Sequence, residues 1–175
     1  PVDFTNEGIR GLCHDRATMF PAQCGQGATW NKELISEIAR VTVEEAKALG
    51  YTNIYSPILD IAQDPRWGRV VECYGEDPFL TTKMGLAVVK GLQGDGTQKY
   101  DKAHACAKHY AVHSGPEWNR HSYNAENISI RDLRETYLPA FKALVTEGKV
   151  KEVMCAYNRF EGEPCCSNKT LLINI

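Results

Sequence analysis

Short apolar runs alternate with amphipathic helical segments along this 175-residue chain, and this alternation limits the folds open to it. Helical spacing and bounded apolar runs predict, in order, helix 30–49, strand 54–61, helix 78–92, strand 104–112, helix 130–147 and strand 150–157. Strands separated by helices predict a parallel sheet with right-handed crossovers. The fold class is therefore α/β, either a (β/α)8 barrel or a doubly wound sheet.

The ends of the predicted helices carry capping signals. Asn31, Asp77 and Ser129 each stand just before a helical segment, where a side-chain oxygen can accept hydrogen bonds from free backbone N–H groups. Pro139 lies inside the helix 130–147 and is expected to kink it. We expect the opening residues to form a loop and a further helix to start at Asn168.

The length of the chain fits part of a barrel. A complete (β/α)8 barrel needs about 250 residues, whereas 175 residues supply roughly half of its strands and helices. We therefore expect residues 1–175 to be a fragment of a longer protein.

The bulk composition excludes several classes of partner. A net charge of −2 gives no reason to expect nucleic acid or an anionic membrane surface. No apolar run approaches the roughly 20 residues that span a bilayer. No cofactor is expected from the motifs.

Seven cysteines are present, without the paired spacing typical of a zinc site. Cys106 and Cys155 lie inside predicted strands, where a free cysteine behaves as a small apolar residue. We expect mostly free structural thiols and no metal, with one or two disulfides as the alternative.

The loop that follows strand 54–61 is dense in polar side chains. Residues 64–77 hold two arginines, a tryptophan and several carboxylates. The ends of parallel strands are where α/β enzymes place their chemistry. Arginine and carboxylate groups bind hydroxyls, and a flat indole covers a sugar face. The loop therefore suits a polyhydroxylated ligand.

Polar residues also follow or end the other apolar segments. Glu7 follows the opening residues, Arg69 follows strand 54–61, Lys108 and His109 lie in strand 104–112, and Tyr157 with Asn158 closes strand 150–157. In a barrel these positions converge on one mouth. The alternative for Lys108 and His109 is a buried pair satisfied by its neighbours.

Other residues of these loops have two interpretations each. Trp67 either contacts the ligand or plugs its loop against the sheet, and Arg120 either lines the mouth or lies on a solvated surface. Asp64 and Arg66 are expected to lock their loop to itself.

Two acidic residues are assigned to orientation. Glu72, three residues after Arg69, is expected to orient that arginine, and Asp60 is placed to do the same. The remaining histidines have no informative spacing: His14, His104, His113 and His121.

Five motifs together resemble glycoside hydrolase family 3: Asn6-Glu7-Gly8, DPRWGR at 64–69, YGEDP at 74–78, AKHY at 107–110 and VMCAYN at 153–158. The resemblance implies that residues 1–175 belong to the N-terminal (β/α)8 barrel of that family. It implies an exo-acting, retaining enzyme that removes a sugar from the non-reducing end of β-linked oligosaccharides or aryl glycosides.

The resemblance also implies roles for single residues. Glu7 matches a carboxylate on sugar hydroxyls, Arg69, Lys108 and His109 match hydroxyl-binding residues of the −1 subsite, and Tyr157 matches a tyrosine near the anomeric centre. The family's nucleophilic aspartate and its acid/base carboxylate are expected beyond Ile175, with the rest of the barrel and C-terminal domains.

Glu7 bears on the choice of sugar. Many glucosidases of the family have aspartate there, whereas xylosidase-like members have glutamate. Glutamate is one methylene longer and crowds the space of a hexose hydroxymethyl, a difference worth about 1–3 kcal/mol. Arg10 stands where the family usually has histidine.

The lead prediction is thus a β-xylosidase, and β-glucosidase is the close alternative. A non-catalytic sugar-binding barrel and a phosphorylase with a cationic phosphate pocket are the rivals from other classes. Because its expected substrates come from plant polymers, we expect the protein to be periplasmic or secreted.

Overall fold

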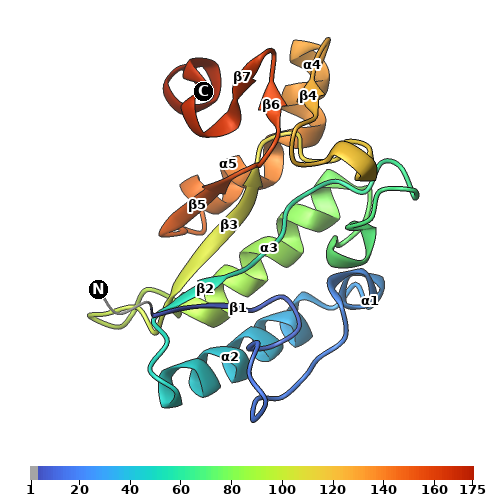
Figure 1. Ribbon diagram of the computed structural model, residues 1–175. Helices are drawn as coiled ribbons and strands as arrows, with labels where there is room; N and C mark the ends of the chain where they lie inside the picture. Colours follow the sequence, from blue (N-terminus) through green and yellow to red (C-terminus); the bar gives the residue numbers. More distant parts are fainter. Residues whose placement is uncertain (1–3) are drawn as a thin grey trace.

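Four parallel strands form the main sheet of the computed structural model, which describes residues 4–175 (Figure 1). They are β1 (Thr5–Glu7), β2 (Asn53–Tyr55), β3 (His104–Tyr110) and β5 (Glu152–Cys155), in the order β1-β2-β3-β5. Every neighbouring pair is parallel. The predicted parallel α/β sheet is confirmed.

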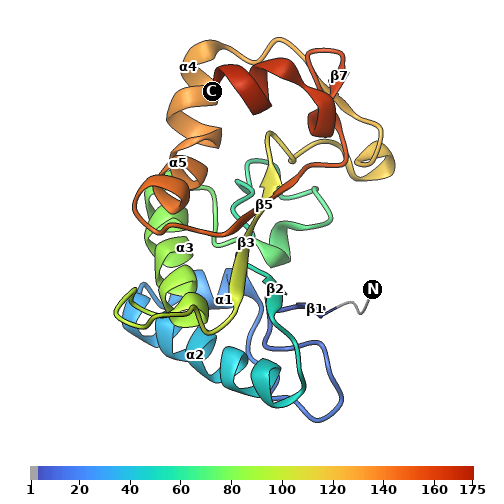
Figure 2. The ribbon, with the colours of Figure 1, turned by 90° about the vertical axis from the view of Figure 1, so that its left-hand side faces the viewer.

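Helices connect the strands and lie on one face of the sheet. The three long ones are α2 (Lys32–Ala48), α3 (Pro78–Gln93) and α5 (Pro139–Thr146). Figure 2 shows all three on the same side of the strands. Their apolar faces and the sheet enclose a core that includes Ile35, Val43, Ile54, Met84, Val88, Leu92, Ala105, Phe141 and Leu144. This is the repeating strand-helix architecture of part of a (β/α)8 barrel.

The predicted caps explain where two helices begin. Asn31 Oδ1 accepts the Leu34 N–H at 2.9 Å, and Asp77 accepts the N–H groups of Phe79 and Leu80 at 2.9 and 3.3 Å. Gly91 lets α2 and α3 approach closely. A Cβ atom on Gly91 would lie 2.5 Å from the Cβ of Ala39.

Two strand predictions need correction. The opening residues were expected to form a loop, yet Thr5–Glu7 pair with Asn53–Tyr55 as β1. The predicted strand 54–61 ends at Tyr55. Pro57 has no N–H for a regular ladder, and beyond it Leu59 donates to the Lys108 carbonyl at 2.6 Å in an irregular continuation.

The predicted helix 130–147 is interrupted as expected at Pro139. It consists of α4 (Ile130–Asp132), a π-helical turn at Leu133–Tyr137 and α5. Proline lacks an N–H and clashes with the preceding turn, so a regular helix cannot pass through it. At the far end, the predicted helix from Asn168 is a π-helical turn at Thr170–Asn174.

A small second sheet joins the loops that follow β3 and β5. It consists of β4 (Asn124–Ala125), β6 (Arg159–Phe160) and β7 (Glu163–Pro164), with β4 parallel to β6 and β6 antiparallel to β7. The remaining short helix is α1 (Gln23–Ala28). Neither the sheet nor α1 was predicted, because each strand is only two residues long and α1 has six.

One pair of cysteines departs from the free-thiol prediction. Cys155, at the end of β5, forms a disulfide with Cys166, their Cα atoms 5.4 Å apart. The β6–β7 hairpin returns the chain to the end of β5 and makes this pairing reachable. The other five cysteines, all in the described part of the chain, are free. Burial raises the pKa of the Cys106 thiol to about 12, which fits the apolar role predicted for it.

Among residues 4–175, none of the helices combines the length and the apolar character needed to cross a membrane.

Candidate functional site

The ends of β1 and β3 bring Glu7 and Lys108 into contact. Lys108 Nζ donates to both carboxylate oxygens of Glu7, at 2.6 and 2.8 Å. The lysine side chain is 3% exposed and that of Glu7 is 41% exposed. Lys108 Nζ also lies 5.9 Å from the centroid of the Tyr55 ring. A buried ammonium group thus holds a carboxylate that solvent can still reach.

Arg69 is held by Glu72, as the spacing predicts. Its Nε and Nη2 donate to the two carboxylate oxygens of Glu72 at 2.9 and 2.6 Å. Burial alone would raise the pKa of Glu72, but the hydrogen bonds and charge of Arg69 leave that pKa below its usual value. The guanidinium is therefore fixed in direction and neutralised.

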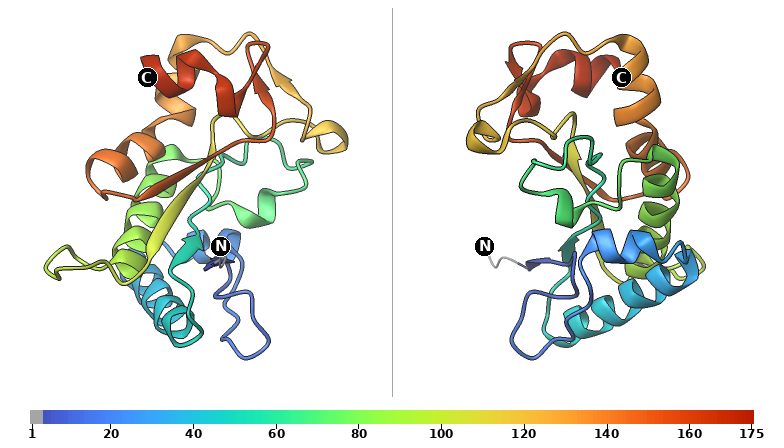
Figure 3. Two further views of the ribbon diagram at one scale, coloured as in Figure 1. Left: turned by 60° about the vertical axis from the view of Figure 1, so that its left-hand side comes forward. Right: turned by 90° about the vertical axis from the view of Figure 1, so that its right-hand side faces the viewer.

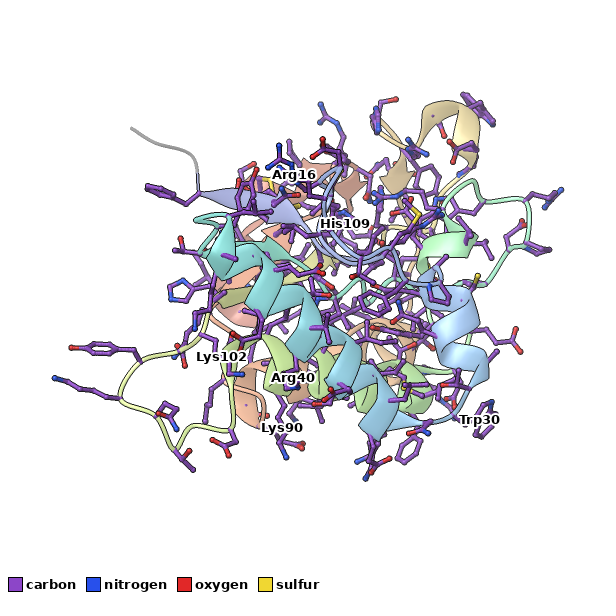
Figure 4. The ribbon with its side chains drawn as sticks, turned by 90° about the horizontal axis from the view of Figure 1, so that it is seen from below. Arg16, Trp30, Arg40, Lys90, Lys102 and His109 are labelled. Atoms are coloured by element: carbon purple, nitrogen blue, oxygen red, sulfur yellow. A yellow bond between two sulfur atoms is a disulfide. The ribbon has the colours of Figure 1, made fainter. Side chains whose placement is uncertain are left out.

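Asp60 has a different partner from the one predicted. It orients His109 rather than Arg69, because the irregular segment that follows β2 lies beside β3. Asp60 Oδ1 accepts the backbone N–H of His109 at 3.0 Å, and its Oδ2 lies 2.8 Å from His109 Nδ1. Both side chains are almost fully buried. Figure 4 shows His109 within the body of the molecule.

The tautomer of His109 follows from its two neighbours. Arg69 Nη1 lies 3.3 Å from His109 Nε2, and a guanidinium can only donate. His109 Nε2 therefore accepts, and Nδ1 carries the proton that it donates to Asp60. One chain of hydrogen bonds runs from Asp60 through His109 and Arg69 to Glu72.

His113 and Asn158 belong to the same cluster; Asn158 follows Tyr157 at the end of the predicted strand 150–157, whereas the spacing of His113 gives no signal. Asn158 donates to the carbonyls of Val112 and Arg159 at 3.2 and 2.9 Å, so its Oδ1 faces His113 Nδ1 at 3.0 Å. His113 is 2% exposed, and burial lowers its pKa. The chain turns after β3 at Val112, whose φ is 61°, and no periodic pattern could reveal that turn.

Tyr157 and Trp67 both lie at the edge of the cluster, but Tyr157 is exposed and Trp67 is buried. The Tyr157 ring stacks on His109 with centroids 6.4 Å apart and is 63% exposed. Trp67 is 3% exposed and packs with Ile58 and Cys73. Of the two interpretations of Trp67, the structure supports the plug.

The remaining predicted residues lie on loops at the same end of the sheet. Arg66 binds Asp64 through its backbone and side chain, which lowers the pKa of that carboxyl to about 2. The loop is thus locked to itself, as predicted. Arg120 donates to Glu117, which also accepts the Gly68 N–H at 2.9 Å. Arg120 therefore lies close to the DPRWGR loop.

Three buried side chains have the composition of a metal site. One ligand atom from each of Asp60, His109 and His113 lies within 4.8 Å of the others. A metal would have to displace the proton shared by His109 and Asp60, next to the fixed positive charge of Arg69. The hydrogen-bond network accounts for this geometry better than a cation does.

The cluster lies at one end of the strands, with Glu7 and Tyr157 on its exposed side. Two hollows of the described residues, of about 880 and 640 Å³, are lined by other segments, the smaller one largely by side chains of α5 and the last helical turn. Four strands cannot close a barrel, so the predicted convergence takes place without an enclosed pocket. Glu7, Arg69, Lys108, His109 and Tyr157 nevertheless come together at one end of the strands.

Comparison with known proteins finds similarity along the whole chain. The family model described as the glycosyl hydrolase family 3 N-terminal domain matches residues 2–175. A xylan 1,4-beta-xylosidase of Xylanibacter ruminicola is 44% identical, with 97% of this chain and 22% of that protein covered. A beta-xylosidase of Formosa agariphila is 45% identical, with coverage of 97% and 24%.

Solved structures of glycosidases also match this chain along nearly its whole length. A GH3 exo-beta-xylosidase in complex with a xylobiose aziridine probe has a TM-score of 0.90 and 34% identity over 98% of this chain and 24% of that one. A beta-glucosidase from Listeria innocua has a TM-score of 0.88 and 38% identity over 100% and 24%. The chain spans roughly a quarter of the length of these proteins, and its fold is the N-terminal portion of their barrel.

Proposed function

This chain belongs to glycoside hydrolase family 3 through its N-terminal domain, and we propose that the full-length protein is an exo-acting, retaining β-xylosidase. Its substrates are β-linked xylo-oligosaccharides and aryl β-xylosides, cleaved at the non-reducing end. Glu7, Arg69, Lys108, His109 and Tyr157 bind the terminal sugar in the −1 subsite. The rest of the barrel and further domains complete the enzyme.

The main support for this proposal is that each cationic side chain of the site is paired with a carboxylate. Lys108 is neutralised by Glu7 and Arg69 by Glu72, each through two short hydrogen bonds. Such pairs offer both donors and acceptors to hydroxyl groups without net charge. A phosphorylase would need unpaired cations for phosphate, and the described cluster pairs both of its cations.

We assign the catalytic carboxylates to another part of the full-length protein. Retaining hydrolysis needs two carboxyl groups about 5–5.5 Å apart, one of them free to attack the anomeric carbon. Glu7, Glu72 and Asp60 are each committed to Lys108, Arg69 or His109. We therefore assign the nucleophile to an aspartate that follows Ile175 in the full-length protein. A non-catalytic sugar-binding barrel would lack it.

Xylose is favoured over glucose by the length of Glu7. Lys108 holds both oxygens of the glutamate, so the carboxylate cannot swing away to admit a hydroxymethyl group. The xylosidase names of the curated relatives agree with this choice. β-Glucosidase is the second candidate, because several solved relatives of similar identity are β-glucosidases.

Shortening Glu7 tests the choice of sugar. In the full-length protein, the wild type is expected to hydrolyse aryl β-xyloside better than aryl β-glucoside. Glu7→Asp removes one methylene and should shift the ratio of the two kcat/KM values toward glucoside by about tenfold. The measurement is that ratio under identical conditions.

Glu44→Asp is the matched control, because Glu44 pairs with Lys102 on the helical side of the sheet. It should leave the ratio unchanged. A wild type that prefers glucoside contradicts the crowding argument. Equal losses on both substrates in Glu7→Asp would mean that Glu7 binds hydroxyls common to the two sugars.

We also propose that the protein is periplasmic or secreted. The Cys155–Cys166 disulfide supports it, because such bonds persist in oxidising compartments. We expect mass spectrometry of the alkylated protein from its native source to find this pair oxidised and Cys106 reduced. Recovery of Cys155 and Cys166 as free thiols would contradict this location.

A further inference from the structure

Trp118 is a large aromatic side chain that the −1 subsite does not use. It is 85% exposed and lies in a short 3-10 turn at Glu117–Asn119, in the loop after β3. Figure 3 shows this turn next to the loop that follows β2, at the same end of the sheet. Most of the Trp118 indole is therefore accessible to a ligand.

One side of the Trp118 loop is tied to the residue before Arg69. Glu117 accepts the Gly68 N–H at 2.9 Å and also binds Arg120. A Cβ atom on Gly68 would lie 2.3 Å from the Glu117 carboxyl group, so the absence of a side chain at Gly68 lets Glu117 approach the backbone closely. The loop is thereby held at a fixed place beside the −1 residues.

The other side of the loop reaches Tyr157 through His121. The His121 and Tyr157 rings have centroids 4.8 Å apart, and Tyr157 in turn stacks on His109. A continuous series of rings thus leads from the buried His109 outward to the loop that carries Trp118. The position next to the −1 subsite, on its outer side, is where the departing part of a substrate lies.

The surroundings of Trp118 favour a sugar over a protein partner. A hollow of about 200 Å³ is lined by Trp118 and by polar residues, namely Glu117, Asn119, Arg120, His121 and Ser122. A protein interface buries an apolar core around such a tryptophan. A flat indole among hydroxyl-binding groups instead matches a sugar ring, which has apolar C–H faces and polar edges.

We propose that Trp118 is the platform for the departing sugar and determines aglycone preference. The ligand is the second xylose of a β-linked xylo-oligosaccharide, stacked on the indole, with Arg120 and His121 beside its hydroxyls. This inference rests on the proposed glycosidase activity. Trp118 does not contact the terminal sugar and takes no part in bond cleavage.

A substrate without an aglycone sugar isolates this role. In the full-length protein, kcat/KM is measured for xylobiose and for β-xylosyl fluoride, whose leaving group is a single atom. Trp118→Ala is expected to lower the xylobiose-to-fluoride ratio by about tenfold, equivalent to about 1.4 kcal/mol. Trp118→Phe keeps an aromatic face and should restore most of the ratio.

Trp30→Ala is the matched control, because Trp30 is 78% exposed and lies on the periphery, away from His109 (Figure 4). It should leave the ratio unchanged. An unchanged ratio in Trp118→Ala, or equal losses on both substrates, would overturn the inference while wild-type activity stands. A wild type inactive on both substrates would overturn the proposed function and the inference with it.

Discussion

Replacing Lys108 with methionine is expected to lower kcat/KM of the full-length enzyme for aryl β-xyloside by about 100-fold, or about 2.7 kcal/mol. Methionine keeps the length of the side chain but leaves the Glu7 carboxylate without its two hydrogen bonds. Truncating one member of a buried charged pair costs about 2–5 kcal/mol. We expect the lower part of that range because Glu7 is 41% exposed and water can solvate it.

Lys102→Met is the control for loss of a lysine, since Lys102 pairs with Glu44 in a partly exposed bridge at 2.9 Å. Its kcat/KM should stay near the wild-type value. Thermal unfolding of both variants separates loss of fold from loss of binding. An unchanged kcat/KM in Lys108→Met would remove Lys108 from the site.

Replacing Asp60 with asparagine is expected to lower kcat/KM by about 30-fold, or roughly 2 kcal/mol, within the range for a hydrogen bond to a charged group. The amide cannot accept from both the backbone N–H and the Nδ1 proton of His109 as the carboxylate does. If the ring changes tautomer, its Nε2–H meets Arg69 Nη1, a donor, at 3.3 Å. Arg69 then loses its alignment toward the sugar.

Nitrogen NMR of His109 reads the tautomer directly. The wild type should have the proton on Nδ1, and Asp60→Asn should move it to Nε2 or mix the two forms. Asp101→Asn, in the Lys151 ion pair, should change neither the tautomer nor kcat/KM. A variant at Asp60 that keeps full activity and the wild-type tautomer would show that Asp60 does not position His109.

Local signals made the helices predictable. Asn31 and Asp77 cap their helices through hydrogen bonds to residues two or three positions ahead, so the sequence contains both partners. Pro139 likewise acts on its own turn. The parallel sheet followed from the alternation of these helices with apolar runs, and it did not depend on the bounds of any one strand.

Strand limits were less predictable because they depend on pairing between distant segments. Thr5–Glu7 has no apolar pattern and becomes β1 only through β2. The apolar run after Tyr55 continues the core, but Pro57 prevents a regular ladder there. The Cys155–Cys166 pair depends on the β6–β7 hairpin, which the spacing of the cysteines does not reveal.

The site residues were predictable where the position of a residue along a strand decides which end of the sheet its side chain reaches. Glu7, Arg69, Lys108, His109 and Tyr157 lie in the last residues of strands or in the segments that follow them, and they meet at one end of the sheet. The partner of Asp60 and the place of His113 depend on how the chain turns after β2 and β3. Those turns are set by tertiary contacts such as Asn158 with Val112, which no local pattern contains.

We expect the full-length protein to release xylose from the non-reducing end with retention of configuration. Proton NMR of xylotriose hydrolysis can follow the anomeric signals of the products before mutarotation. The first products should be β-xylose and xylobiose, one xylose per cleavage. Initial release of α-xylose, or no release of xylose under conditions where the protein hydrolyses a β-glucoside, would contradict this expectation.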